Sequence, residues 1–145
     1  MADVSFLGSK ITVIAVPTFP QGIPIEEFPD DADPINFENI DLTKYAVGVN
    51  GDLISWDVAN VIPCEINVIP NSEADKNLDI LATACRPAKN KVAIKNDITL
   101  VVAEVNGKIT TYTGGKIVNV PTGNSASSDS RIKTKTYTFV FQNKI

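Results

Sequence analysis

Acidic side chains are the groups in this sequence that could do chemistry, and their spacing suggests two possible activities. The run at residues 30–33 (DDAD) has the composition of a calcium site, but it lacks the glycine and the distal glutamate of a calcium-binding loop. Two carboxylate pairs, Glu26 with Glu27 and Asp57 with Glu65, could supply the acid and the base of glycoside hydrolysis if they converged. Nothing in the sequence indicates that they converge, and we interpret the acidic run as a solvated loop.

Histidine is absent from the chain, and with it the commonest general base and the commonest transition-metal ligand. Catalysis by Ser–His–Asp or Cys–His is therefore excluded within one chain. Cys64 and Cys85 are too few for a zinc site, and their apolar surroundings predict buried free thiols. We predict no catalytic residue, no metal and no cofactor; a small enzyme remains as an alternative that would need an unseen carboxylate pair.

Length and composition predict a single globular domain over residues 1–145. Hydrophobic residues make up 43% of the chain and charged residues 21%, as in ordinary soluble proteins. No apolar run reaches the ~20 residues of a membrane span, and the N-terminus lacks the basic start of a signal peptide. We therefore expect a cytoplasmic protein, or a particle assembled in the cytoplasm, with no membrane partner.

Charge is divided unevenly along the chain. Residues 1–60 hold ten acids and two bases, whereas residues 61–145 hold seven acids and eleven bases. Two interpretations are open: separate surface patches, or an acidic segment of one copy that meets a basic face of another copy. The pI of about 4.7 argues against tight binding to a phosphate backbone.

The segment 61–87 predicts a strand, a sharp turn and the only α-helix, at about residues 72–86. Ser72 can cap the helix by accepting a hydrogen bond from a free amide of the first turn, and Pro87 stops it. Ile80 points away from the apolar stripe of this helix. The stripe covers one face of a β-sheet and consists of Ala74, Leu78, Leu81, Ala82 and Cys85.

The segment 17–34 is rich in proline, which excludes a helix or a central strand and predicts an extended loop or arm. Long loops of this kind are usually functional or disordered. Two interpretations are open: an arm laid against a partner, or a loop folded back on its own domain. The regularly interspersed apolar residues that suit an arm are Phe19, Ile23, Ile25 and Phe28.

The remaining chain predicts short strands joined by tight turns, with Asn50-Gly51 and Asn106-Gly107 as hairpin signals and Gly114-Gly115 as a third turn. The four large aromatic residues Tyr45, Trp56, Tyr112 and Tyr137 could form a stacking platform, but we interpret them as core residues. Together the pattern predicts a mainly β protein, an antiparallel β-sandwich or small barrel with one flanking helix. The expected strands are 10–16, 35–49, 53–57, 98–105, 108–113 and 116–120.

The C-terminal stretch 131–142 predicts one long last strand that follows a small, polar and flexible loop at 121–130. Its side chains alternate, so that one face is basic at its start and aromatic at its end. The basic side chains are Arg131, Lys133 and Lys135. A strand of twelve residues would span about 40 Å, and its first half is expected to project beyond the core.

In the order and character of these elements, the chain resembles the tail tube proteins of contractile-tailed bacteriophages, a family whose fold also occurs in type VI secretion tubes. The resemblance covers roughly residues 40–145. It is carried by the sequence YAVGVNGD at 45–52, the strand-to-helix segment 65–81 with PNSEAD at its turn, the Asn-Gly hairpin and the terminal TYTFVF strand.

The resemblance implies a structural virion protein that forms hexameric rings, stacked head to tail into a tail tube for genome ejection. It also implies the tail sheath, tape measure and baseplate or terminator proteins as partners, with assembly in the host cytoplasm. DNA would pass through the lumen without specific binding, because an acidic lumen repels phosphates.

Within this resemblance, we expect subunit contacts at the apolar residues of segment 17–34, at Ile80, and at the basic residues Arg131, Lys133 and Lys135. The basic residues would meet acids from segment 26–41 of a neighbouring copy. The alternative function is a carbohydrate- or surface-binding β-sandwich module that uses exposed aromatic residues and the loop 122–130.

Overall fold

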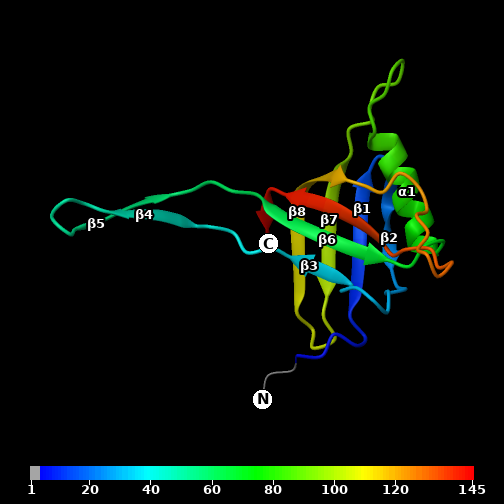
Figure 1. Ribbon diagram of the computed structural model, residues 1–145, viewed down its shortest axis with the longest axis horizontal. Coiled ribbons are helices and arrows are strands. Elements are labelled where there is room, and N and C mark those ends of the chain that lie inside the picture. The colour runs from blue at the N-terminus through cyan, green and yellow to red at the C-terminus, as the bar shows by residue number, and fades with distance from the viewer. Residues whose placement is uncertain (1–3) are drawn as a thin grey trace.

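The structure is a computed structural model that describes residues 4–145. It confirms the predicted class: antiparallel strands dominate, and one helix flanks them (Figure 1). In chain order the elements are β1 (Lys10–Val16), β2 (Phe19–Ile25), β3 (Ile35–Phe37), β4 (Thr43–Val47), β5 (Leu53–Asp57), β6 (Ile62–Val68), α1 (Glu73–Cys85), β7 (Asp97–Ala103), β8 (Ile109–Asn119), β9 (Lys135–Phe141) and β10 (Asn143–Lys144).

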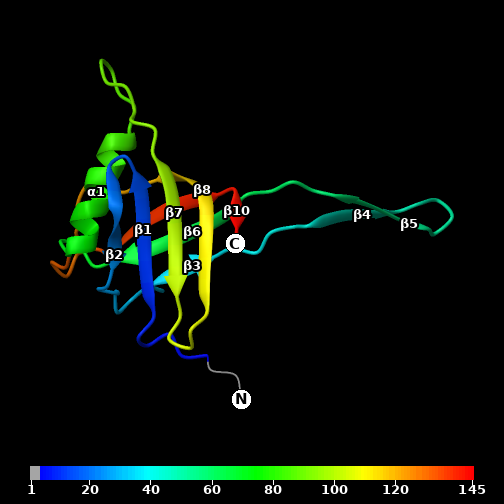
Figure 2. The same cartoon turned by 180° about the vertical axis from the view of Figure 1, so that it is seen from behind.

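The body is one continuous sheet folded into two layers, with strand order β2-β1-β7-β8-β9-β6-β3 and β10 paired beside β8. Figure 2 shows β1, β2, β7 and β8 as one layer, behind which β9, β6 and β3 cross as the second. The first strand of this order is not paired with the last, so the sheet is an open sandwich and not a closed barrel.

The core lies between these layers and is closed at one side by the helix. Alternate residues of the strands point inward, as period-2 patterning requires. Helix α1 contributes the predicted stripe, of which Cys85 alone is only half-buried, and Ile80 is 54% exposed as expected. The largest fully buried side chains include Ile11, Ile66, Leu100, Tyr137, Phe139 and Phe141.

Residues 19–25 of segment 17–34 do not form a free arm, because they form strand β2 along β1. Ile23 and Ile25 are fully buried in the core of their own chain. Pro20 and Pro24 are tolerated because β2 is an edge strand, where a missing backbone donor costs no sheet hydrogen bond. Of the two open interpretations, the loop folded back on its own domain describes this part of the chain.

Strand β8 corrects the prediction of a turn at Gly114-Gly115. Residues 109–115 pair with β7 and residues 116–119 with β9, so one long strand passes from one layer to the other at the glycines. Gly114 has a positive φ of 65°, which favours glycine. A Cβ at Gly115 would lie 2.7 Å from the Ile98 carbonyl oxygen and closer still to the Phe141 ring. The glycines thus serve a bend in one strand.

The last strand is shorter than predicted, because β9 begins at Lys135 and not at residue 131. Its alternation is confirmed, with Lys135, Tyr137, Phe139 and Phe141 all buried. Residues 131–134 instead continue the loop after β8, which is held by a bridge between Ala126 and Ile132. The flexibility of residues 121–130 stays a prediction.

Candidate assembly surface

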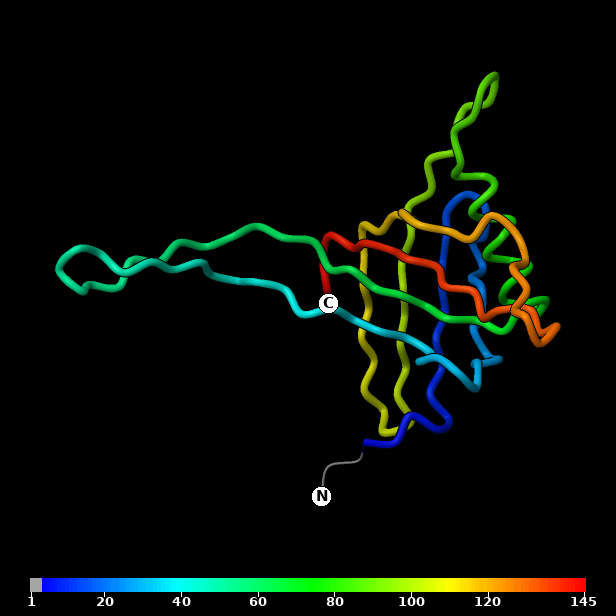
Figure 3. The backbone as a smooth tube through the Cα atoms, in the orientation of Figure 1, coloured from blue at the N-terminus to red at the C-terminus, as the bar shows by residue number. Residues whose placement is uncertain are grey.

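A long hairpin, here called the arm (residues 38–61), leaves the body between β3 and β6. Strands β4 and β5 pair with each other, from Thr43 opposite Asp57 to Val47 opposite Leu53, and with no other strand in the described part of the chain. Figures 1 and 3 show the arm extending far from the sandwich, opposite the side that carries α1. Every residue of β4 and β5 is exposed to solvent.

Local sequence explains why the arm is a hairpin. The turn at Asn50-Gly51 is confirmed: Gly51 has a φ of 84°, and the Gly48 amide donates to the Asp52 carbonyl at 2.8 Å. Near the root, the Val58 amide donates to the Leu42 carbonyl at 3.0 Å. The pairing therefore continues beyond the two strands and sets the direction of the arm.

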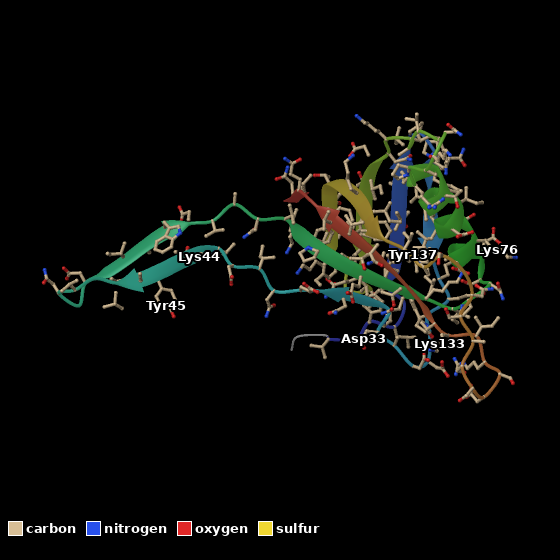
Figure 4. All side chains as sticks on the ribbon, turned by 45° about the horizontal axis from the view of Figure 1, so that its top comes forward. Asp33, Lys44, Tyr45, Lys76, Lys133 and Tyr137 are labelled. Atoms are coloured by element: carbon tan, nitrogen blue, oxygen red, sulfur yellow. The ribbon has the colours of Figure 1, made fainter. Side chains whose placement is uncertain are left out.

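Apolar side chains occur on both faces of the arm, which is the unusual feature of this structure. Directly opposed residues of an antiparallel pair share a face, so Tyr45, Val47 and Leu53 lie together, exposed by 74%, 70% and 72%. Ile54 and Trp56 share the other face with Lys44. Figure 4 shows Lys44 and Tyr45 pointing to opposite sides of the ribbon.

Such an arm has the composition of an interaction surface. A two-stranded hairpin alone is marginally stable in water, and contiguous exposed apolar residues mark interaction sites. Strict alternation of apolar and polar residues would give the hairpin one polar face that could stay in contact with solvent. In β4 and β5 neither face is polar throughout. Both sides of the hairpin therefore have the character of an interaction surface.

A buried polar cluster ties α1 to β9 in the body. Asp75 accepts hydrogen bonds from the Tyr137 hydroxyl at 2.9 Å, from the Lys135 ammonium at 3.2 Å and from the Asn71 amide at 2.9 Å. Burial, and then the hydrogen bond to Asp75, raises the pKa of Tyr137 well above its usual range. The Ser72 hydroxyl caps the helix as predicted, accepting from the Asp75 amide at 3.2 Å.

One of the three basic residues expected to meet acids of a neighbouring copy, Arg131, meets an acid of its own chain. The Arg131 guanidinium lies 2.5 Å from the Asp30 carboxylate, and the Thr134 hydroxyl donates to Asp31 at 2.5 Å. The hydrogen bond from Arg131 is the main cause that lowers the pKa of Asp30. The acidic run 30–33 therefore anchors the loop before β9.

The other residues predicted for a subunit interface are dispersed. Ile23, Ile25 and Lys135 are buried in their own chain, so we no longer propose them for an interface. Phe19 and Phe28 are half-buried, and Phe28 makes an edge contact with the Phe6 ring at 5.9 Å between centroids. The structure leaves Ile80, Arg131 and Lys133 exposed, but does not bring them together.

The sequence does not identify the arm as a site, because its pattern predicts that the four large aromatic residues, including those of the arm, lie in the core. That prediction is right for Tyr112 and Tyr137, which are buried, and wrong for Tyr45 and Trp56. The hairpin turn and the strand at 53–57 are predicted correctly. The sequence does not reveal that nothing else within residues 4–145 covers these strands.

Cys64 and Cys85 are free thiols, as predicted, with Cys64 buried and Cys85 half-buried. Burial raises the pKa of Cys64 to about 12, so its thiol stays protonated and inert at neutral pH. Over residues 4–145, His, Cys, Asp and Glu form no group of three or more that could hold a metal ion. In the same range, no helix is long and apolar enough to cross a membrane.

Comparison with known proteins gives a family. The model of the family described as tail fiber protein gp32 matches residues 2–145, nearly the whole chain. No curated protein is similar to this chain in sequence.

Solved structures share the fold. A chain of an extracellular contractile injection system, the PVC sheath-tube complex in the extended state, aligns with a TM-score of 0.58 and 13% identity over 99% of this chain and 92% of that one. A chain of the PVC sheath/tube terminator in the extended state aligns with a TM-score of 0.55 and 13% identity, over 100% and 96%. At 13% identity, the similarity to these two chains shows a shared fold alone.

Proposed function

The chain belongs to the tail fiber protein gp32 family and is a structural protein of a phage-type tail; from this premise we propose that it assembles with copies of itself into stacked, hexameric rings that form the tail tube. The proposal follows the resemblance noted from the sequence. The two structural neighbours come from a sheath-tube complex and a sheath/tube terminator, and their fold supports this choice among tail proteins.

The observation that carries the proposal is the arm with its two apolar faces. The body of the same chain does not cover the arm, so a surface on another molecule must. An arm of one copy that docks on a different surface of the next copy makes a heterologous contact, and such contacts build rings or filaments. A protein of this kind is a repeating structural part and not an enzyme.

The partners of such a tube are a sheath outside it, a tape measure inside it during assembly, and baseplate and terminator proteins at its ends. The net charge of −4 suits a conduit through which DNA slides without binding. Under this proposal, the protein is part of the virion and assembles in the host cytoplasm.

The carbohydrate-binding alternative is not favoured by any observation. A sugar platform needs several aromatic rings on one surface, but Tyr45 and Trp56 lie on opposite faces of the arm. Tyr112 and Tyr137 are buried. The arm therefore presents one aromatic ring to each side, in an apolar setting that suits protein contacts.

Trp56 is the only tryptophan and lies on the arm, which makes it a direct reporter of assembly. We expect its emission maximum to shift to shorter wavelength as protein concentration rises, because the indole, 49% exposed in the single chain, becomes buried. The measurement is tryptophan emission over a concentration series, with sedimentation velocity on the same samples. Assembly without a shift in emission would show that the arm is not the contact.

A further inference from the structure

A second projection leaves the body beside α1; it is here called the prong (residues 86–96). It follows the end of the helix and returns to β7 through a tight turn, in which the Lys91 amide donates to the Ala88 carbonyl at 3.0 Å and Asn90 has a φ of 62°. Its base is fixed by the Asn96 side chain, which accepts from the Thr18 amide at 3.1 Å.

The prong is basic and partly apolar. It holds four basic residues and no acidic one, and Val92 at its side is 89% exposed. Within residues 4–145, no ion pair engages any of the four, although the Lys91 ammonium donates to the Thr83 carbonyl. The basic residues are Arg86, Lys89, Lys91 and Lys95.

The arm is the chemical complement of the prong. It holds four acidic residues against the single base Lys44, and all four are exposed, without an ion pair in the described part of the chain. Its apolar face of Tyr45, Val47 and Leu53 could cover the apolar side of a prong. The acidic residues are Glu38, Asp41, Asp52 and Asp57.

We propose that the acidic arm of one copy docks on the basic prong of a second copy. This inference rests on the proposed function, for which it names the partner surface. Within one chain the two projections cannot meet, because they leave distant sides of the body in different directions (Figures 1 and 3). The contact is therefore between copies, and because arm and prong are different surfaces it is heterologous and repeats from copy to copy.

Complementary charge fixes the orientation of this contact, and apolar burial gives it strength. Opposite charges at the rim steer association and exclude wrong pairings. Val92 and Ile94, the second of which is 49% exposed, provide the apolar centre that a stable interface requires. A polyanion such as DNA offers no such apolar surface, which favours the arm as the occupant of the prong.

The test is a charge swap. An arm variant carries Asp52→Lys and Asp57→Lys, a prong variant carries Lys89→Glu and Lys95→Glu, and a third chain carries all four substitutions. We expect the arm variant and the prong variant each to lower the association constant about tenfold or more. The fourfold chain, which carries all four substitutions, should have an association constant within about threefold of wild type. Sedimentation velocity at low and high salt measures the constant, and salt should weaken the wild type and the fourfold chain alike.

Two matched controls carry the same change of charge elsewhere on exposed residues: Glu26→Lys with Glu27→Lys, and Lys108→Glu with Lys144→Glu. They should leave the association constant within about threefold of wild type. Equal thermal unfolding midpoints for all variants establish that each is folded, which is expected because every substituted side chain is exposed.

Absence of recovery in the fourfold chain overturns the proposal, as do arm or prong variants that assemble like wild type. A short DNA duplex that binds the wild type but not the prong variant, with assembly unchanged, also overturns it and makes the prong a nucleic-acid site. If the wild type assembles with burial of Trp56 while the swaps have no effect, this inference alone fails. If the wild type stays monomeric, the proposed function fails with it.

Discussion

Replacement of Tyr45, Val47 and Leu53 by serine in one variant is expected to abolish self-assembly while leaving the folded monomer intact. Each of these side chains is about 70% exposed in the single chain, so its removal costs the monomer little. Full burial of one such side chain against a partner contributes about 1.5–3 kcal/mol. Loss of all three should lower the association constant by at least about a thousandfold, measured by sedimentation velocity.

The matched control replaces three apolar residues that are also exposed but lie on the body, namely Val105, Ile109 and Val118. This variant should assemble like wild type. If the control loses assembly as severely as the arm variant, or if the arm variant still assembles, the arm is not the contact surface.

Replacement of Asp75 by alanine is expected to destabilise the fold by about 3–5 kcal/mol, which is the cost of removing one partner of a buried ion pair. The substitution leaves the Lys135 ammonium buried without its counter-charge and removes the acceptor of the Tyr137 hydroxyl. It also leaves the Asn71 amide without its acceptor at the start of α1. Urea denaturation monitored by circular dichroism measures the change in the free energy of unfolding.

Two further variants separate the ion pair from general damage. Glu27→Ala removes an exposed carboxylate and should change stability by less than about 0.5 kcal/mol. Asp75→Leu combined with Lys135→Met removes both charges and should be more stable than Asp75→Ala alone. A loss below about 1 kcal/mol for Asp75→Ala would contradict the role assigned to this cluster.

Elements with a strong local signal could be predicted from the sequence. Strand β1 is apolar at nearly every position and ends just before Pro17, and α1 combines a Ser72 cap with one apolar stripe; the structure contains both. The two Asn-Gly turns are also confirmed, because positive φ at glycine is a local requirement. These signals depend on neighbouring residues and not on the tertiary fold.

Two local rules are incomplete without their structural context. Proline in segment 17–34 excludes a helix or a central strand, but it allows an edge strand, and the alternation of Phe19, Ile23 and Ile25 with proline is the signal for one. Gly114-Gly115 was taken as a turn, although paired glycines also permit a close backbone approach, here to Phe141.

The candidate site could be predicted as a hairpin but not as an arm. Strands with apolar residues on both faces normally lie in the core of their own chain, so the sequence of β4 and β5 indicated burial. In the structure the same pattern is exposed, and under the proposed function a second molecule buries it. The periodicity of apolar residues in a sequence predicts that a side chain is buried, but it does not tell whether its own chain or another chain buries it.

Negative-stain electron microscopy of the purified protein over a concentration series, at low salt, tests the central claim most directly. The account predicts rings or hollow tubes of uniform diameter for the wild type and single small particles for the serine variant of the arm. Small particles alone for the wild type at every concentration would contradict the claim that this chain builds a tube through its arm.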